Sequence, residues 1–227
     1  MTITTTTLTR AAGLAAVAGG LLFIAVQVKH PVLDAAFTTT TEYTVRETAK
    51  IFMAVFSLIG ITGIYLRQVR QTGVLGLLGY GVLALGYLGI MTGVVIGVFV
   101  LPTLAGGEPG YVNDVLGVAT SRKPVGDVGP IGLLIQGGGF AYIVGGIVFG
   151  IAVFRAGILA RWAAALLTIG AVATIATSQL PELVQRLFAL PVSVALVGLG
   201  YSLWREQRTQ ADATGTDSSQ LDPAGAR

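Results

Sequence analysis

The chain has 227 residues, of which 53% are hydrophobic and 11% charged, and its mean hydropathy is +0.79. Soluble domains carry about 25% charged residues, so this composition excludes an ordinary water-soluble protein. The net charge is +3, but the basic residues are spread along the chain, which argues against a nucleic-acid partner, and the lack of cysteine excludes disulfides and thiolate chemistry.

A helix needs about 20 apolar residues to cross the hydrocarbon core of a bilayer. Six apolar stretches approach this length, and they cover residues 11–28, 51–66, 74–101, 131–154, 162–180 and 187–204. The sequence therefore predicts an all-α fold, an integral membrane bundle of six transmembrane helices in one domain over residues 1–204. Residues 205–227 are polar and small, and we expect them to form a disordered cytoplasmic tail.

The first stretch also has the features of a signal peptide. Arg10 precedes it, and Ala35 and Ala36 offer a cleavage site. Its 18 residues exceed the roughly 7 to 15 of a signal-peptide core, so we expect a retained membrane helix.

The loops between the stretches alternate in length and charge. Residues 30–47 and 102–130 form two long segments on one side, and the second is expected to contain a short helix over 111–119 on the outer surface. Glu47 is expected in the first turn of the second membrane helix, where the helix dipole favours a carboxylate. The short connections on the other side carry Arg67, Arg70, Arg155 and Arg161 and no acid. The positive-inside rule then places both termini in the cytoplasm.

Glycine is frequent within the apolar stretches, where small residues let helices approach closely. Gly89, Gly93 and Gly97 recur every four residues in the third stretch, and Gly146 and Gly150 do so in the fourth. We expect these two faces to pack against each other or against a second copy of the chain.

The run of glycines at 137–139 raises a separate question. The dinucleotide-binding pattern G-x-G-x-x-G fails here because Tyr142 occupies its third glycine position. Three successive glycines weaken a helix, so we expect either tight packing or a kinked, flexible lining to a cavity.

Uncharged polar residues enter the outer ends of the stretches, whereas charged residues are expected only at or beyond the helix ends. One hypothesis is that the polar residues at the outer ends line a ligand pocket that is open to the exterior. Its candidate residues are Gln27, His30, Gln136 and Tyr142. The alternative is that these groups hydrogen-bond to one another across helices. His30 is the only histidine, which is a poor metal signature, so we expect no metal and no cofactor.

A resemblance to a known protein family lies in two segments, VFRAGILARWAAALLTIGAVATIA and TLTRAAGLAAVAGGLLFI. With Arg155, Gly157, Leu159, Arg161 and Trp162 they resemble an uncharacterised bacterial, actinobacterial-type family of small multi-pass membrane proteins, a domain of unknown function. The resemblance implies the multi-pass architecture and no particular activity.

Three functions stay open at this point. The first is a small accessory protein that binds a ligand, a second copy of itself or another membrane protein. The second is a transporter or channel for a small uncharged solute, which requires a continuous polar path. The third is a lipid-modifying enzyme that uses His30 with Asp34 or Glu47, although no catalytic motif supports it.

Overall fold

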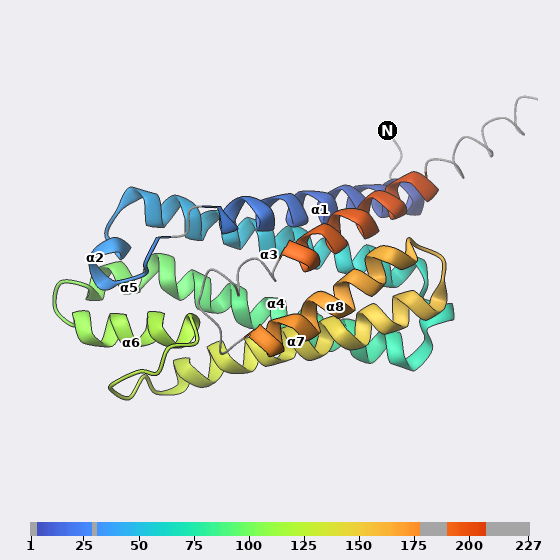
Figure 1. Ribbon diagram of the computed structural model, residues 1–227. Helices are drawn as coiled ribbons and strands as arrows, with labels where there is room; N and C mark the ends of the chain where they lie inside the picture. Colours follow the sequence, from blue (N-terminus) through green and yellow to red (C-terminus); the bar gives the residue numbers. More distant parts are fainter. Residues whose placement is uncertain (1–3, 29–30, 178–189, 208–227) are drawn as a thin grey trace, which may run out of the picture.

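The structure is a computed structural model that describes residues 4–28, 31–177 and 190–207, and all its regular elements in these ranges are helices (Figure 1). They are α1 (Thr5–Gln27), α2 (Ala35–Thr38), α3 (Thr41–Arg67), α4 (Val69–Phe99), α5 (Leu101–Leu104), α6 (Pro109–Ala119), α7 (Pro130–Ala156), α8 (Arg161–Thr177) and a final helix over 190–207. The long helices lie lengthwise beside one another, while α2, α5 and α6 gather at one end. The predicted all-α fold is confirmed.

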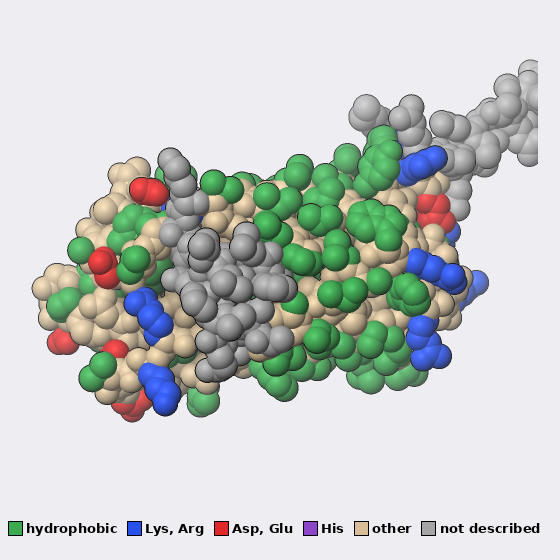
Figure 2. Space-filling view, in the orientation of Figure 1, with side chains coloured by type: hydrophobic (Ala, Val, Ile, Leu, Met, Phe, Trp, Pro, Cys, Tyr) green, Lys and Arg blue, Asp and Glu red, His purple; other side chains and the backbone are tan. Residues whose placement is uncertain are grey.

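Four helices are long and apolar enough to cross a membrane, namely α1, α3, α4 and α7, and α8 is a shorter apolar helix. Apolar side chains cover the middle of the face seen in Figure 2, and charged side chains gather at its two ends. This distribution indicates a membrane protein. The predicted end of the fifth stretch, at 180, and the predicted start of the sixth, at 187, lie outside the described residues.

Local signals explain where the long helices begin and end. Thr4 and Thr40 cap α1 and α3 by accepting hydrogen bonds from the amides of Thr7 and Tyr43, each at 3.2 Å. Gly157 ends α7 in the left-handed conformation, with φ of 66°. Gly73 interrupts α4 with φ of 55° and ψ of −147°, so its regular part begins at the predicted position, 74.

Glycines set the contact between α4 and α7. A Cβ atom on Gly79 would lie 2.5 Å from the amide nitrogen of Phe149, and one on Gly89 would lie 2.8 Å from the Cα of Gly138. Gly86 similarly lies against the backbone of Tyr142. The two helices therefore touch backbone to backbone along much of their length.

The predicted packing of the two glycine faces against each other is wrong, whereas their packing against a second copy of the chain stays a prediction. Gly89 does contact α7, but through Gly138, whereas Gly146 lies beside Ala171 and Gly150 beside Thr168, both in α8. These glycines pack helices within the chain, but the two faces do not meet.

The end of the bundle near α2, α5 and α6 has a hydrophobic core of its own. We call residues 31–40 and 100–129 the cap. Its buried core includes Leu33, Leu101, Val112, Val115 and Leu116, together with Tyr43 from α3. Two hydrogen bonds join the cap's separate segments, from the Ala35 amide to Asn113 Oδ1 (2.8 Å) and from Arg122 Nη2 to the Leu33 carbonyl (3.0 Å). The two long segments are thus a folded layer, in which the predicted short helix is confirmed as α6.

At the opposite end, the bundle extends beyond the predicted boundary at 204. The last helix runs to 207, where Gln207 is buried, and Glu206 forms an ion pair with Arg67 of α3. Glu206 therefore belongs to the bundle rather than to the tail, and residues 208–227 lie outside the described residues.

Candidate ligand-binding cavity

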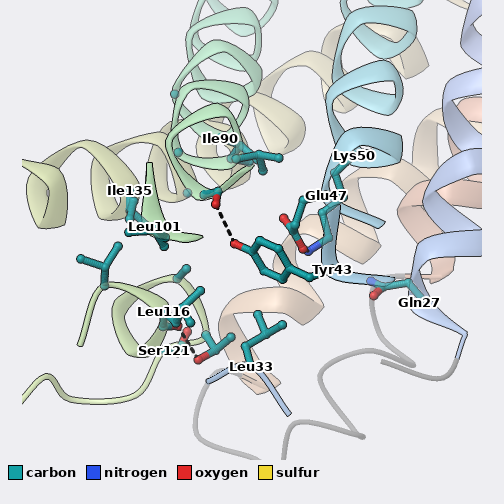
Figure 3. Close-up of a pocket in the computed structure, with 18 of the residues that line it drawn as sticks. Gln27, Leu33, Tyr43, Glu47, Lys50, Ile90, Leu101, Leu116, Ser121 and Ile135 are labelled. Atoms are coloured by element: carbon teal, nitrogen blue, oxygen red, sulfur yellow. Dashed lines mark hydrogen bonds and ion pairs between the residues drawn. The ribbon is translucent and has the colours of Figure 1, made fainter. Parts of the chain in front are cut away.

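A cavity of about 420 Å³ lies between the cap and the bundle (Figure 3). Its walls come from α3, α4, α6 and α7, with further residues from α1, α5 and α8. Most of the lining is apolar, including Leu33, Ile90, Leu101, Leu116 and Ile135. Cavities of 300 to 1,000 Å³ with mainly apolar walls and a few polar groups are typical of small-molecule sites.

The charged side chains of the lining lie on one face of α3, whereas the serine and threonine residues of the lining, Thr120, Ser121 and Thr174, lie elsewhere. Tyr43, Glu47 and Lys50 follow one another at intervals of four and three residues, so one side of the helix presents all three. Gln27 at the end of α1 lies beside this face. We call these four residues the polar corner of the cavity.

Glu47 and Lys50 form an ion pair in the polar corner. Their side chains are only 9% and 19% exposed. Removing two charges from water costs several kcal/mol per ion before their attraction is counted, so stability alone is a weak reason for such a pair. The Lys50 ammonium has three donor hydrogens, and Glu47 Oε1 is its one hydrogen-bond partner among the described residues. Its remaining donors are open to a ligand.

Tyr43 has a positioning role in the same face. Its hydroxyl donates a hydrogen bond of 3.1 Å to the carbonyl of Gly97 in α4, and its side chain is 1% exposed. This bond ties α3 to α4 at the end of the cavity nearest the cap.

Glycine backbone forms the wall opposite the polar corner. Gly89, Gly93 and Gly97 of α4 and Gly139 of α7 all line the cavity. A Cβ on Gly93 would meet only Ile135 Cγ1, at 3.4 Å, and one on Gly139 would meet nothing within 4 Å. The small residues therefore leave the cavity wider at these two positions, both of which are partly exposed.

The glycines at 137–139 have three different surroundings. Gly138 is packed against Gly89, Gly139 lines the cavity, and Gly137 is exposed with open space around it. The helix α7 remains regular through all three, so the predicted kink is wrong while both predicted roles, packing and lining, occur.

The four predicted pocket residues do not converge. Gln27 lines the cavity, but Gln136 is exposed and absent from its lining. Tyr142 lies between α4 and α7, where its ring meets Tyr87 edge-to-face at 5.2 Å. His30 lies outside the described residues.

Tyr43 and Lys50 were missed as lining residues because the helix begins at Thr41, six residues before Glu47, which was predicted in its first turn. Thr40 caps it, so Glu47 lies in the second turn and Lys50 in the third. Glu47 is therefore not held by the helix dipole, which acts within the first turn, and the two charges are not at the helix end. The threonines that precede Glu42 were the available signal, because threonine before an acidic first turn is typical of a helix start.

The geometry does not support the acid–base pair that a lipid-modifying enzyme would need. Asp34 caps α2 by accepting a hydrogen bond of 2.7 Å from the Phe37 amide, and it does not line the cavity. Glu47 is engaged by Lys50. In the part of the chain that is described, no three His, Asp or Glu residues lie close enough together to hold a metal ion.

Three other buried side chains carry polar atoms without a partner in the described structure. They are the hydroxyl of Ser57, the amide of Gln68 and the hydroxyl of Tyr142. None of them lines the cavity. Buried polar atoms left unpaired cost about 1 to 3 kcal/mol each, which makes these positions useful for stability tests.

The cavity can thus enclose an apolar body and offer donors and acceptors to one polar group. Comparison of the chain with protein families, with curated proteins and with solved structures gives no match. The function is therefore argued from the cavity itself.

Proposed function

We propose that this chain is a six-helix integral membrane protein that binds a small amphipathic molecule in the cavity beneath the cap. One observation carries the proposal: among the described residues, a mainly apolar, partly open cavity of about 420 Å³ is lined by one ion pair, between the buried Glu47 and the partly exposed Lys50. Apolar walls suit a hydrocarbon body, and the pair offers a place for one polar group.

The proposed membrane placement adds α8 and the helix over 190–207 to the four longer spans. Both termini lie on the cytoplasmic side, where Arg67, Arg155 and Arg161 occupy short connections. The setting is a bacterial inner membrane, and membership of the uncharacterised bacterial family stays a prediction.

The same placement gives the depth of the site. Lys50 lies 17 residues before Arg67 in α3, which is about 26 Å at 1.5 Å per residue. With Arg67 at the inner edge of a hydrocarbon core about 30 Å thick, Lys50 lies just inside the outer edge. The polar group of an amphipathic molecule in the bilayer lies at this same depth.

Binding accounts for the geometry better than transport does. The cavity's lining on α4 and α7 reaches inward to Gly89 and Gly139. Further inward, Gly86 lies directly against the Tyr142 backbone, which leaves no room between the two helices at that level. A channel would need the polar path to continue past this contact.

The test is photolabelling of the protein in phosphatidylcholine nanodiscs. The probes are three ten-carbon amphiphiles that carry an aliphatic diazirine and end in a hydroxyl, a sulfate or an ammonium group. At least one probe should label peptides that line the cavity, and Gly139→Leu, which fills the cavity, should abolish this labelling. Gly137→Leu is the matched control, because Gly137 has the same open space but lies outside the lining. If each of the three probes labels the Gly139→Leu and Gly137→Leu variants equally, the proposal is refuted.

A further inference from the structure

We propose that the cavity selects an uncharged amphiphile with a hydroxyl head over anionic and cationic amphiphiles of the same chain length. This inference rests on the proposed function, since it concerns the ligand of the same cavity. It follows from the charges, the donors and the volume of the lining.

The charges of the lining cancel. Glu47 and Lys50 are the one acid and the one base that line the cavity in the described structure, and they are paired with each other. An anionic head could reach Lys50 only beside Glu47, and a cationic head could reach Glu47 only beside Lys50. In both cases a like charge is brought into a mainly apolar space, which is unfavourable.

Among the described residues, no second cation lines the cavity. Arg46, one turn from Lys50, donates to the carbonyls of Val26 (3.2 Å) and Val28 (2.9 Å) at the end of α1. Arg122 donates to the Leu33 carbonyl at 3.0 Å. Neither arginine lines the cavity, so both are committed to holding the walls together.

A hydroxyl group complements the ion pair without disturbing it. It accepts a hydrogen bond from one of the open donors of Lys50 and donates its own hydrogen to the Glu47 carboxylate. Hydrogen bonds to charged groups are stronger than those between neutral groups, so the pair gains from a neutral head and is not split by it. An ether or ester lacks the donor and would satisfy only Lys50.

The volume gives the size of the apolar body that the cavity can surround. If each heavy atom takes about the 30 Å³ of a liquid water molecule, a cavity of about 420 Å³ holds on the order of 14 heavy atoms. A chain of about ten carbons with a hydroxyl group fits this limit. The open positions at Gly93 and Gly139 contribute to the space for the chain.

The deciding experiment is competition in the same nanodiscs. Labelling by the hydroxyl photoprobe is measured while n-decanol, decyl sulfate or decylammonium is added at equal mole fractions in the bilayer. We expect n-decanol to compete at least about tenfold more effectively than either charged compound. Such a ratio corresponds to about 1.4 kcal/mol in binding free energy.

Variants of the ion pair give a second readout. Glu47→Gln leaves Lys50 alone and should shift the preference towards decyl sulfate, whereas Lys50→Gln should shift it towards decylammonium. The double variant Glu47→Gln/Lys50→Gln leaves no unpaired charge to destabilise the fold, and the advantage of the alcohol over the charged heads should shrink in it.

The two proposals fail in different ways. If decyl sulfate or decylammonium competes as well as n-decanol, while Gly139→Leu still abolishes labelling by the photoprobes, the cavity binds amphiphiles but the head-group inference is wrong. An unchanged order of the three competitors in the double variant would also overturn it. If Gly139→Leu leaves the labelling by every probe unchanged, the proposed function itself is refuted.

Discussion

Substituting Gly79 with alanine tests the backbone contact between α4 and α7. The new methyl carbon would lie 2.5 Å from the Phe149 amide nitrogen and 2.7 Å from its Cα. Normal contacts between carbon atoms are about 3.5 to 4.0 Å, so the helices must separate by about 1 Å at this level. The obstacle is backbone, which cannot change rotamer.

The magnitude follows from two opposing effects. Overpacking costs about 1 to 3 kcal/mol, and the immovable obstacle places this site near the upper value. Replacing glycine by alanine inside a helix returns about 1 kcal/mol. We therefore expect Gly79→Ala to lower the free energy of unfolding by about 2 kcal/mol.

Gly81→Ala is the control, because Gly81 belongs to the same helix and a Cβ there meets nothing within 4 Å. It should be neutral or stabilising by up to about 1 kcal/mol. The assay is unfolding in mixed micelles with increasing SDS, followed by circular dichroism. If the two variants agree within about 0.5 kcal/mol, the helices are not held at backbone contact and the reasoning is wrong.

Three further predictions concern stability in the same assay. Gly73→Ala should destabilise by about 1 to 3 kcal/mol through its φ of 55° and ψ of −147° alone, since no atom lies within 4 Å of the new carbon; a neutral result would contradict the break in α4. Tyr142→Phe keeps the ring against Tyr87 and removes a buried hydroxyl that forms no hydrogen bond of normal geometry among the described residues, so it should be neutral or stabilising, and a loss above about 1 kcal/mol would show that its interaction with Tyr87 is a hydrogen bond. Glu47→Gln should cost about 3 to 5 kcal/mol by leaving Lys50 unpaired, and adding Lys50→Gln should restore part of the loss; a double variant less stable than the single one would refute the cost assigned to the unpaired charge.

The architecture was the more predictable part, because apolar stretches and their separations are visible in a single sequence. The predicted starts at 74, 131 and 162 differ from the regular part of α4 and from the starts of α7 and α8 by at most one residue. The start of α3 was misplaced because Glu47 was taken to lie in the first turn of the span, whereas the helix begins six residues earlier, next to the cap.

The candidate site was less predictable, because it depends on which helix faces which. Glycines four apart suggested one interface, yet α4 and α7 meet through residues seven apart, Gly79 with Gly86 on one helix and Gly138 with Gly145 on the other. Both spacings return to the same side of a helix, and only the neighbours decide between them. The cavity follows from this packing of α4 against α7, because Gly93 and Gly139 then face open space rather than a neighbouring helix.

The composition of the cap has a consequence for how the chain is made. Leu33 and Tyr43 are synthesised long before Val112 and Leu116, yet the four share one hydrophobic core. During synthesis the first two have no partners until the chain beyond α4 has emerged, so the outer layer closes late and only after the α3–α4 hairpin is in place. A nascent chain stalled before residue 100 would display an unfinished apolar surface, a feature by which quality-control proteases or chaperones could distinguish it from the completed protein.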